Sequence, residues 1–320
     1  DYCFAEADGI DESSDNVPLE RIISMIDEFK AGGGKHMGIV GAGEPFHPRN
    51  KTDLYNVLDH AKENNLWTTI FTTADLITDK DLDMLDQYPR ITLQVKYNSS
   101  YPEVQDKIVN NPGYTHRRVV SLEKMFERGY NDGSRLGVVT SILKENLQEM
   151  PAILRMARQK NLIFDADTLI SRGRGSTCRQ NPLDEEIRSC IAKLRKVDQG
   201  FDNYWEIHGT YIASPPCTRF SKHIYIDKTG DAHPCVSSCG VILGNIKEQS
   251  LQDLWDHPAM KIIRAHAYTG RCTTCKNFQE KKCFSCLGRA CENVTTDYIQ
   301  RHRHIQTIGC TNYKAGTRKE

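Results

Sequence analysis

The stretch that decides the fold is residues 19–45, LERIISMIDEFKAGGGKHMGIVGAGEP. Apolar residues recur at helical spacing from Leu19 to Phe29, and three glycines at 32–34 end that pattern. A short apolar run at 37–40 then indicates a strand, which leads into a glycine-rich turn that ends in Glu44 and Pro45. The stretch therefore predicts a helix, a strand and a loop whose backbone can approach a ligand closely.

The same helix-then-strand unit repeats along the next 125 or so residues. Amphipathic periodicity predicts further helices near 54–61, 79–87, 121–128 and 146–160, and short apolar runs predict strands at 66–72, 91–95, 136–142 and 162–170. Repeats of this length need right-handed crossovers and a parallel sheet, either doubly wound or rolled into a full or partial barrel. In both architectures ligands bind at the carboxyl ends of the strands.

The composition excludes several classes of partner. Lys plus Arg and Asp plus Glu number 42 each, so no global field attracts nucleic acid or an anionic membrane. No run of eighteen apolar residues and no signal peptide is present, which predicts a cytoplasmic protein without a membrane partner. In that reducing compartment, twelve cysteines favour metal binding or redox chemistry over structural disulfides.

Most of these cysteines lie in the last third of the chain, where the repeat ends and a hairpin-like segment begins at 224–230. Cys217 and Cys235 flank Gly230, and six more follow: Cys272, Cys275, Cys283, Cys286, Cys291 and Cys310. Thiolates this closely spaced suit iron–sulfur clusters. The two CX2C pairs suit tetrahedral zinc as well, so a zinc-binding interaction module stays open as a different class of function.

Two segments of the first part resemble those of radical SAM enzymes. Cys3, in Asp-Tyr-Cys-Phe, resembles the last cysteine of the CX3CX2C loop that holds the catalytic [4Fe-4S] cluster of that family, although the first two cysteines are missing. The turn at 41–45 is similar to the family's GGE segment, which binds the amino group of S-adenosyl-L-methionine, and Ala42 departs from the commoner form. The chain is therefore expected to be an N-terminally truncated member, inactive as a radical initiator without its upstream cysteines.

The C-terminal part resembles the SPASM domain, which binds auxiliary [4Fe-4S] clusters in the same family. Twelve residues separate Cys217 from Gly230 and four separate Gly230 from Cys235, which fits the opening CX9-15GX4C, whereas the later spacing holds one extra cysteine. The resemblance implies one cluster on Cys217, Cys235 and Cys291, and another on Cys272, Cys275, Cys310 and either Cys283 or Cys286. The fourth ligand of the first cluster stays open between Cys239, the surplus member of the Cys283/Cys286 pair and a substrate atom.

The resemblance also implies the fold and the cofactor site. The fold is an α/β partial (β/α)6 TIM-like barrel that lacks its first strand, over residues 1–205, followed by a small cysteine-rich SPASM domain over 206–320. The amino group of S-adenosylmethionine would contact the turn, and its ribose or carboxylate the strand ends. These cofactor-binding residues would be Gly41, Gly43, Glu44, Thr72, Thr73, Lys96, Ser141 and Arg172.

The function implied is an oxidoreductase or maturase. Such an enzyme takes an electron from a reductant such as flavodoxin or ferredoxin, generates a 5′-deoxyadenosyl radical and oxidises or crosslinks a peptide or protein side chain. A dehydrogenase or epimerase of a sugar or another small molecule is the alternative with the same chemistry. The spacing of the 42 carboxylates marks no catalytic acid or base.

Overall fold

The computed structural model describes residues 3, 15–41, 43–169, 173–176, 180–202, 219–238, 240–281, 287 and 294–307. The chain divides into two compact units. The first comprises residues 1–9, 29–169 and 173–205, and the second comprises 10–28, 170–172 and 206–320. The domain boundary predicted between residues 205 and 206 stays a prediction. Among the described residues, no helix combines the length and the apolar character needed to cross a membrane.

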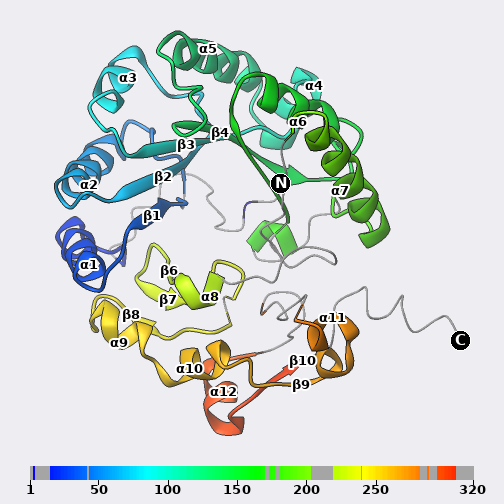
Figure 1. Ribbon diagram of the computed structural model, residues 1–320. Coiled ribbons are helices and arrows are strands. Elements are labelled where there is room, and N and C mark those ends of the chain that lie inside the picture. Colours follow the sequence, from blue (N-terminus) through cyan, green and yellow to red (C-terminus); the bar gives the residue numbers. More distant parts are fainter. Residues whose placement is uncertain are drawn as a thin grey trace, which may run out of the picture. The chain divides into compact units, whose positions relative to one another are not determined.

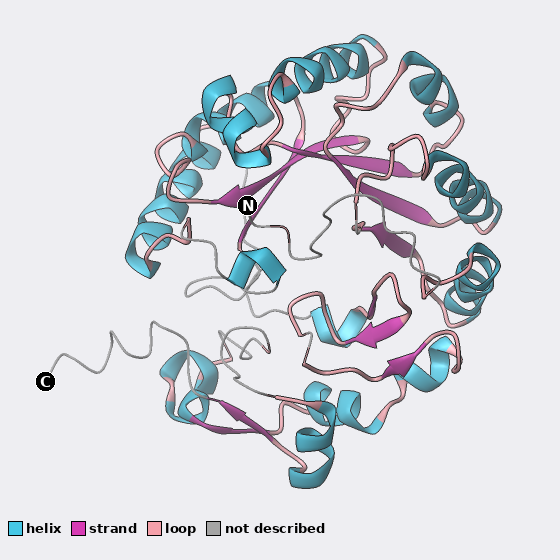
Figure 2. Ribbon diagram, turned by 180° about the vertical axis from the view of Figure 1, so that it is seen from behind, coloured by secondary structure: helices cyan, strands magenta, loops and turns pink. Residues whose placement is uncertain are grey.

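The first unit is built on a five-stranded sheet that curls into a partial barrel (Figure 1). The strands are all parallel and lie in chain order: β1 (His36–Ile39), β2 (Trp67–Thr72), β3 (Ile91–Lys96), β4 (Leu136–Ile142) and β5 (Ile163–Thr168). Helices lie along the outer side of the sheet (Figures 1 and 2): α2 (Lys51–Glu63), α3 (Asp79–Leu85), α4 (Pro102–Val109), α5 (Tyr114–Glu127), α6 (Met150–Gln159) and α7 (Asp184–Gln199). The predicted partial barrel is confirmed.

The two faces of this sheet differ in burial because successive side chains of a strand point to opposite sides. On one face Ile70, Val95 and Val138 are fully buried. On the other face Lys96 and Ser141 are half-buried. One face is therefore closely packed and buried, and the other leaves polar side chains such as Lys96 and Ser141 within reach of a ligand.

No predicted strand end differs by more than two residues from the observed one. The helices deviate more. The helix predicted from residue 146 begins at Met150, because the buried amide of Asn146 accepts the Leu143 N–H (2.9 Å) and donates to the Ser141 carbonyl (2.8 Å), which stabilises a turn there. The helix predicted from residue 121 begins at Tyr114, and α4 was not predicted.

The second unit contains small elements. They are α8 (Arg219–Lys222), β6 (Tyr225–Ile226), β7 (Asp231–His233), β8 (Gly244–Asn245), α9 (Leu251–Trp255), α10 (Pro258–Arg264), β9 (Tyr268–Gly270), the 3₁₀ turn η2 (Arg271–Thr274), α11 (Lys276–Gln279), α12 (Thr296–His302) and β10 (Ile305–Thr307). Strands β6, β7 and β8 form an antiparallel sheet, which confirms the predicted hairpin, and β9 pairs with β10 in parallel.

The hairpin turn between β6 and β7 is closed by the carboxylate of Asp227. It accepts the Thr229 N–H (3.0 Å), the Thr229 hydroxyl (2.8 Å) and the Asp231 N–H (3.1 Å). Burial raises the pKa of Asp227, but these hydrogen bonds and the nearby His233 outweigh it and leave the pKa below its ordinary value. The folded turn therefore stabilises the ionised carboxylate.

Most of helix α1 (Leu19–Ala31), the helix that opens the sequence repeat, belongs to the second unit. The Arg21 guanidinium donates to the carbonyls of Ile246 (2.7 Å) and Gln249 (3.0 Å). The Glu28 carboxylate accepts the N–H of Leu251 (2.5 Å), the first residue of α9. The amphipathic pattern identified this helix, and contacts more than 220 residues away in sequence decide where it packs.

Candidate functional site

The glycine-rich turn after β1 has a backbone that other residues would strain. Gly41 has φ +58°, and a Cβ there would lie 2.7 Å from the Gly43 carbonyl oxygen. Gly43 has φ +132°, which L-residues rarely adopt. The two glycines let the chain reverse within a few residues and bring Glu44 to the carboxyl end of the sheet.

The Glu44 carboxylate joins the ends of β1 and β2. Its Oε1 accepts the Thr72 hydroxyl (2.5 Å) and the Phe46 N–H (3.1 Å). Its Oε2 accepts the N–H (2.7 Å) and the hydroxyl (2.6 Å) of Thr73. Three residues predicted from the sequence as cofactor ligands, Glu44, Thr72 and Thr73, thus meet at one point, although their role is still a prediction.

A second carboxylate, Asp75, lies at the same point and was missed by the sequence analysis. The Thr73 hydroxyl is 2.6 Å from Glu44 Oε2 and 2.8 Å from Asp75 Oδ1. A hydroxyl carries one proton, so it can donate to only one of these two oxygens at a time. Arg117 pairs with Asp75 (3.3 Å) and balances its charge, so the Glu44 carboxylate is the one that carries negative charge for a bound cation such as an ammonium group. The only signal in the sequence is the position of Asp75 just after a strand.

Lys96 and Ser141 form a second polar pair at the ends of β3 and β4. The Lys96 ammonium donates to the Ser141 hydroxyl (2.7 Å). Behind them, the fully buried side chain of Asn98 accepts the Ser141 N–H (2.9 Å), and Asn146 donates to the Asn98 carbonyl (2.9 Å). The structure therefore brings together two more predicted residues and adds two buried amides that fix the loop around them.

The cysteines that the structure describes are free thiols: Cys3, Cys190, Cys235, Cys272 and Cys275. Cys3 is half-buried, and its carbonyl accepts the Arg174 N–H (3.2 Å) from the 3₁₀ turn η1 (Gly173–Ser176) after β5. Burial raises the pKa of Cys190 to about 11, as expected for a core cysteine on α7. The remaining candidates lie outside the described residues: Arg172, Cys217, Cys239, Cys283, Cys286, Cys291 and Cys310.

Cys272 and Cys275 share one tight turn. Cys272 lies in η2 and its N–H donates to the Thr307 hydroxyl (2.9 Å), while the Cys275 N–H donates to the Cys272 carbonyl (3.0 Å). Residues three apart in a 3₁₀ turn lie on one side of it, so both thiols suit a shared metal centre. Within the described parts of the chain, no group of three or more His, Cys, Asp or Glu side chains is arranged to hold a metal ion. Cys235 lies in a separate turn closed by Ser238, whose hydroxyl accepts its N–H (2.9 Å).

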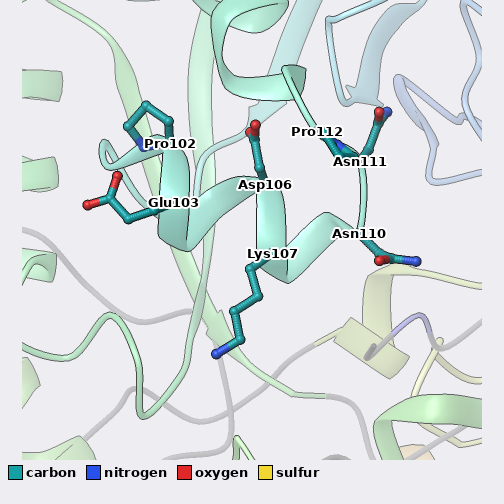
Figure 3. Close-up of a pocket in the computed structure, with 7 residues that line it drawn as sticks. All are labelled: Pro102, Glu103, Asp106, Lys107, Asn110, Asn111 and Pro112. Carbon is teal, nitrogen blue, oxygen red and sulfur yellow. The ribbon is translucent and has the colours of Figure 1, made fainter.

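A shallow pocket of about 280 Å³ lies on α4 and the turn that follows it (Figure 3). It is lined by Pro102, Glu103, Asp106, Lys107, Asn110, Asn111 and Pro112. The Asp106 carboxylate is engaged, because it accepts the N–H (2.8 Å) and hydroxyl (2.5 Å) of Thr115 and the N–H of Gly113 (2.6 Å). The pocket contains none of the predicted site residues, and the Asp106 carboxylate anchors the start of α5.

Comparison with known protein families gives two matches. Residues 1–157 match the model of the radical SAM superfamily, and residues 217–286 match the model of SPASM, an iron–sulfur cluster-binding domain. No curated protein matches the chain.

Solved structures share the fold at low sequence identity. SuiB of Streptococcus suis bound to S-adenosylmethionine matches with a TM-score of 0.71 and 18% identity, over 87% of this chain and 68% of SuiB. SuiB bound to its precursor peptide SuiA matches with a TM-score of 0.68 and 17% identity, over 85% of this chain and 65% of SuiB. The native anSMEcpe structure with bound AdoMet matches with a TM-score of 0.67 and 13% identity, over 94% of this chain and 90% of anSMEcpe. The chain thus spans about two thirds of the length of SuiB.

Proposed function

The chain belongs to the radical SAM superfamily and carries a SPASM iron–sulfur cluster-binding domain, and from this premise we propose that it is an enzyme that cleaves S-adenosylmethionine reductively to oxidise or crosslink a peptide or protein side chain. The observation that carries the proposal is the meeting of Glu44, Thr72 and Thr73 at the carboxyl end of the sheet. Parallel barrels bind their ligands at this end.

Glu44 is proposed to bind the amino group of S-adenosylmethionine, with the Thr73 hydroxyl beside it held between Glu44 and the Arg117-paired Asp75. A carboxylate that already accepts several hydrogen bonds is held in one orientation, so it can receive an ammonium without a further cost of ordering. The Lys96–Ser141 pair offers a cation and a hydroxyl for the carboxylate and the ribose. Arg172 is proposed for the same part of the ligand and lies outside the described residues.

The cysteines are proposed as cluster ligands. When bound, a [4Fe-4S] cluster with an open iron supplies the single electron that splits S-adenosylmethionine into methionine and a 5′-deoxyadenosyl radical. Cys3 would contribute to that cluster, and Cys235, Cys272 and Cys275 would contribute to auxiliary clusters. The other proposed ligands lie outside the described residues: Cys217, Cys283, Cys286, Cys291 and Cys310. The one-electron donor would be a flavodoxin or ferredoxin.

A peptide substrate is supported by the similar fold of SuiB, which was solved with a precursor peptide. A sugar or another small molecule stays as the alternative, because the barrel chemistry is the same and the side chains described at the strand ends do not distinguish the two. A zinc-binding interaction module is disfavoured, since the cysteine-rich segment at 217–286 matches an iron–sulfur domain.

The test is anaerobic reconstitution of the complete native protein with iron and sulfide, followed by iron analysis, electron paramagnetic resonance and assay of 5′-deoxyadenosine with dithionite as reductant. The proposal predicts about four irons for each cluster, a reducible cluster signal and 5′-deoxyadenosine that depends on S-adenosylmethionine. Tightly bound zinc without a cluster signal would overturn it and favour the binding module. Activity towards peptides from the organism that makes this protein, compared with activity towards sugars and aminocyclitols, then separates the two substrate classes.

A further inference from the structure

We infer that the first turn of helix α5, through the hydroxyl of Tyr114, positions the two strand ends that are proposed to bind S-adenosylmethionine. This inference rests on the proposed function. Tyr114 is the first residue of α5. Only 1% of its surface is exposed, so its side chain offers no accessible surface to a ligand. It would act as a positioning residue, through the backbone of the segments that carry Thr73 and Lys96.

The hydroxyl of Tyr114 lies 3.0 Å from the Thr73 carbonyl oxygen and 3.2 Å from the Lys96 carbonyl oxygen. The register of β2 and β3 ends at the pair Thr72 and Val95, so Thr73 and Lys96 are the next residues on the two chains. Tyr114 thus bridges the two chains where their strand pairing ends. The single proton of this hydroxyl can point to only one of the two carbonyl oxygens at a time, but both lie within hydrogen-bond distance, so the Tyr114 hydroxyl ties the two chains together at this point.

The neighbouring residues of the same turn support the same two segments. Arg118 is fully buried, donates to the Ser99 carbonyl (3.1 Å) and lies over the Tyr97 ring (3.9 Å), so it holds the loop that follows Lys96. Arg117 pairs with Asp75 (3.3 Å), which contacts the Thr73 hydroxyl. Residues three and four apart share one face of a helix, so Tyr114, Arg117 and Arg118 act from one face.

The start of α5 is itself held in place. Asp106 accepts the N–H and the hydroxyl of Thr115 and the N–H of Gly113, as described for the pocket of Figure 3. Gly113 has φ +75° at the helix N-cap. Burial raises the pKa of Asp106, but these hydrogen bonds together outweigh it and lower the pKa, which keeps this anchor ionised. A rigid start of α5 lets the Tyr114 hydroxyl define a fixed point rather than follow the strand ends.

The experiment compares Tyr114→Phe with Tyr130→Phe in the reconstituted complete protein. Tyr130 is a matched control, because it is also fully buried and its hydroxyl also donates to one acceptor, Asp86 Oδ1 (2.9 Å), but it follows the other end of α5. Both changes remove one hydroxyl and keep the ring. The readouts are the dissociation constant for S-adenosylmethionine by calorimetry, the iron content and the thermal midpoint.

We expect Tyr114→Phe to raise the dissociation constant about ten-fold, which corresponds to ~1.4 kcal/mol, with unchanged iron content. Both variants should lower the thermal midpoint by similar amounts, since each loses one buried hydroxyl, but Tyr130→Phe should leave the dissociation constant for S-adenosylmethionine within about two-fold of wild type. The positioning role is wrong if Tyr114→Phe binds S-adenosylmethionine as tightly as wild type does, or if both variants bind it more weakly by the same factor. In either case the proposed function stands. If wild type does not bind S-adenosylmethionine, the proposed function itself fails.

Discussion

Replacing Glu44 by glutamine tests the centre of the proposed site. The carboxylate accepts four hydrogen bonds, two from hydroxyls and two from the N–H groups of Phe46 and Thr73. In glutamine one oxygen becomes an NH2 group, which cannot accept, so at least one of these N–H groups loses its partner. An unsatisfied buried donor costs ~1–3 kcal/mol, and the free energy of unfolding should fall by that amount.

The loss of charge should weaken ligand binding more specifically. A hydrogen bond between a carboxylate and an ammonium contributes ~1.5–3 kcal/mol, so Glu44→Gln should raise the dissociation constant for S-adenosylmethionine about ten- to hundred-fold. Calorimetric titration of the reconstituted protein measures it, beside the thermal midpoint.

The matched control for Glu44→Gln is Asp132→Asn. Asp132 accepts the N–H groups of Ser134 (2.7 Å) and Arg135 (2.8 Å) just before β4, at the amino end of the sheet. The same loss of one carboxylate charge there should leave the dissociation constant unchanged. The reasoning is refuted if Glu44→Gln lowers the thermal midpoint while binding S-adenosylmethionine as tightly as wild type, because the carboxylate would then serve the fold alone.

Three further predictions follow from single residues. Gly41→Ala should lower the free energy of unfolding by ~1–3 kcal/mol because of its positive φ, as measured by chemical denaturation. Gly38→Ala, where a Cβ would make only an ordinary contact with the Val40 side chain (3.9 Å), should change it by less than about 0.5 kcal/mol. The lowered pKa of Asp227 stabilises the fold above the unfolded-state value of about 4, and this contribution is lost as pH falls through the folded pKa. Asp227→Asn should therefore flatten the acid limb of a stability–pH curve, and an unchanged limb would contradict this. Cys272→Ser should remove about four irons per chain, whereas Cys190→Ala in the core should keep the iron content; equal content in both would exclude Cys272 as a ligand.

The strands and their parallel pairing could be predicted from the sequence because they follow from local patterns. Each apolar run is short, each helix between runs is long enough for a right-handed crossover, and sequential crossovers place neighbouring runs side by side. The glycines at 41 and 43 and the spacing of Cys217, Gly230 and Cys235 are local as well, and they identified the family. The extent of α4 and the start of α5 could not be predicted, because the hydrogen bonds of the Asp106 carboxylate and a left-handed Gly113 decide them.

The sequence by itself determined the alternation of helices and strands, the turn that carries Glu44 and the cysteine spacing, because each depends on residues close together in the chain. Only the tertiary structure decided that Asp75 joins Glu44 and that Tyr114 bridges Thr73 and Lys96. The two Tyr114 contacts join residues that are 41 and 18 positions apart in the sequence. Both acceptors are backbone carbonyls, which every residue possesses. A hydrogen bond to a backbone group leaves no residue-type pattern in the sequence, so such a partner becomes visible only once the chain is folded.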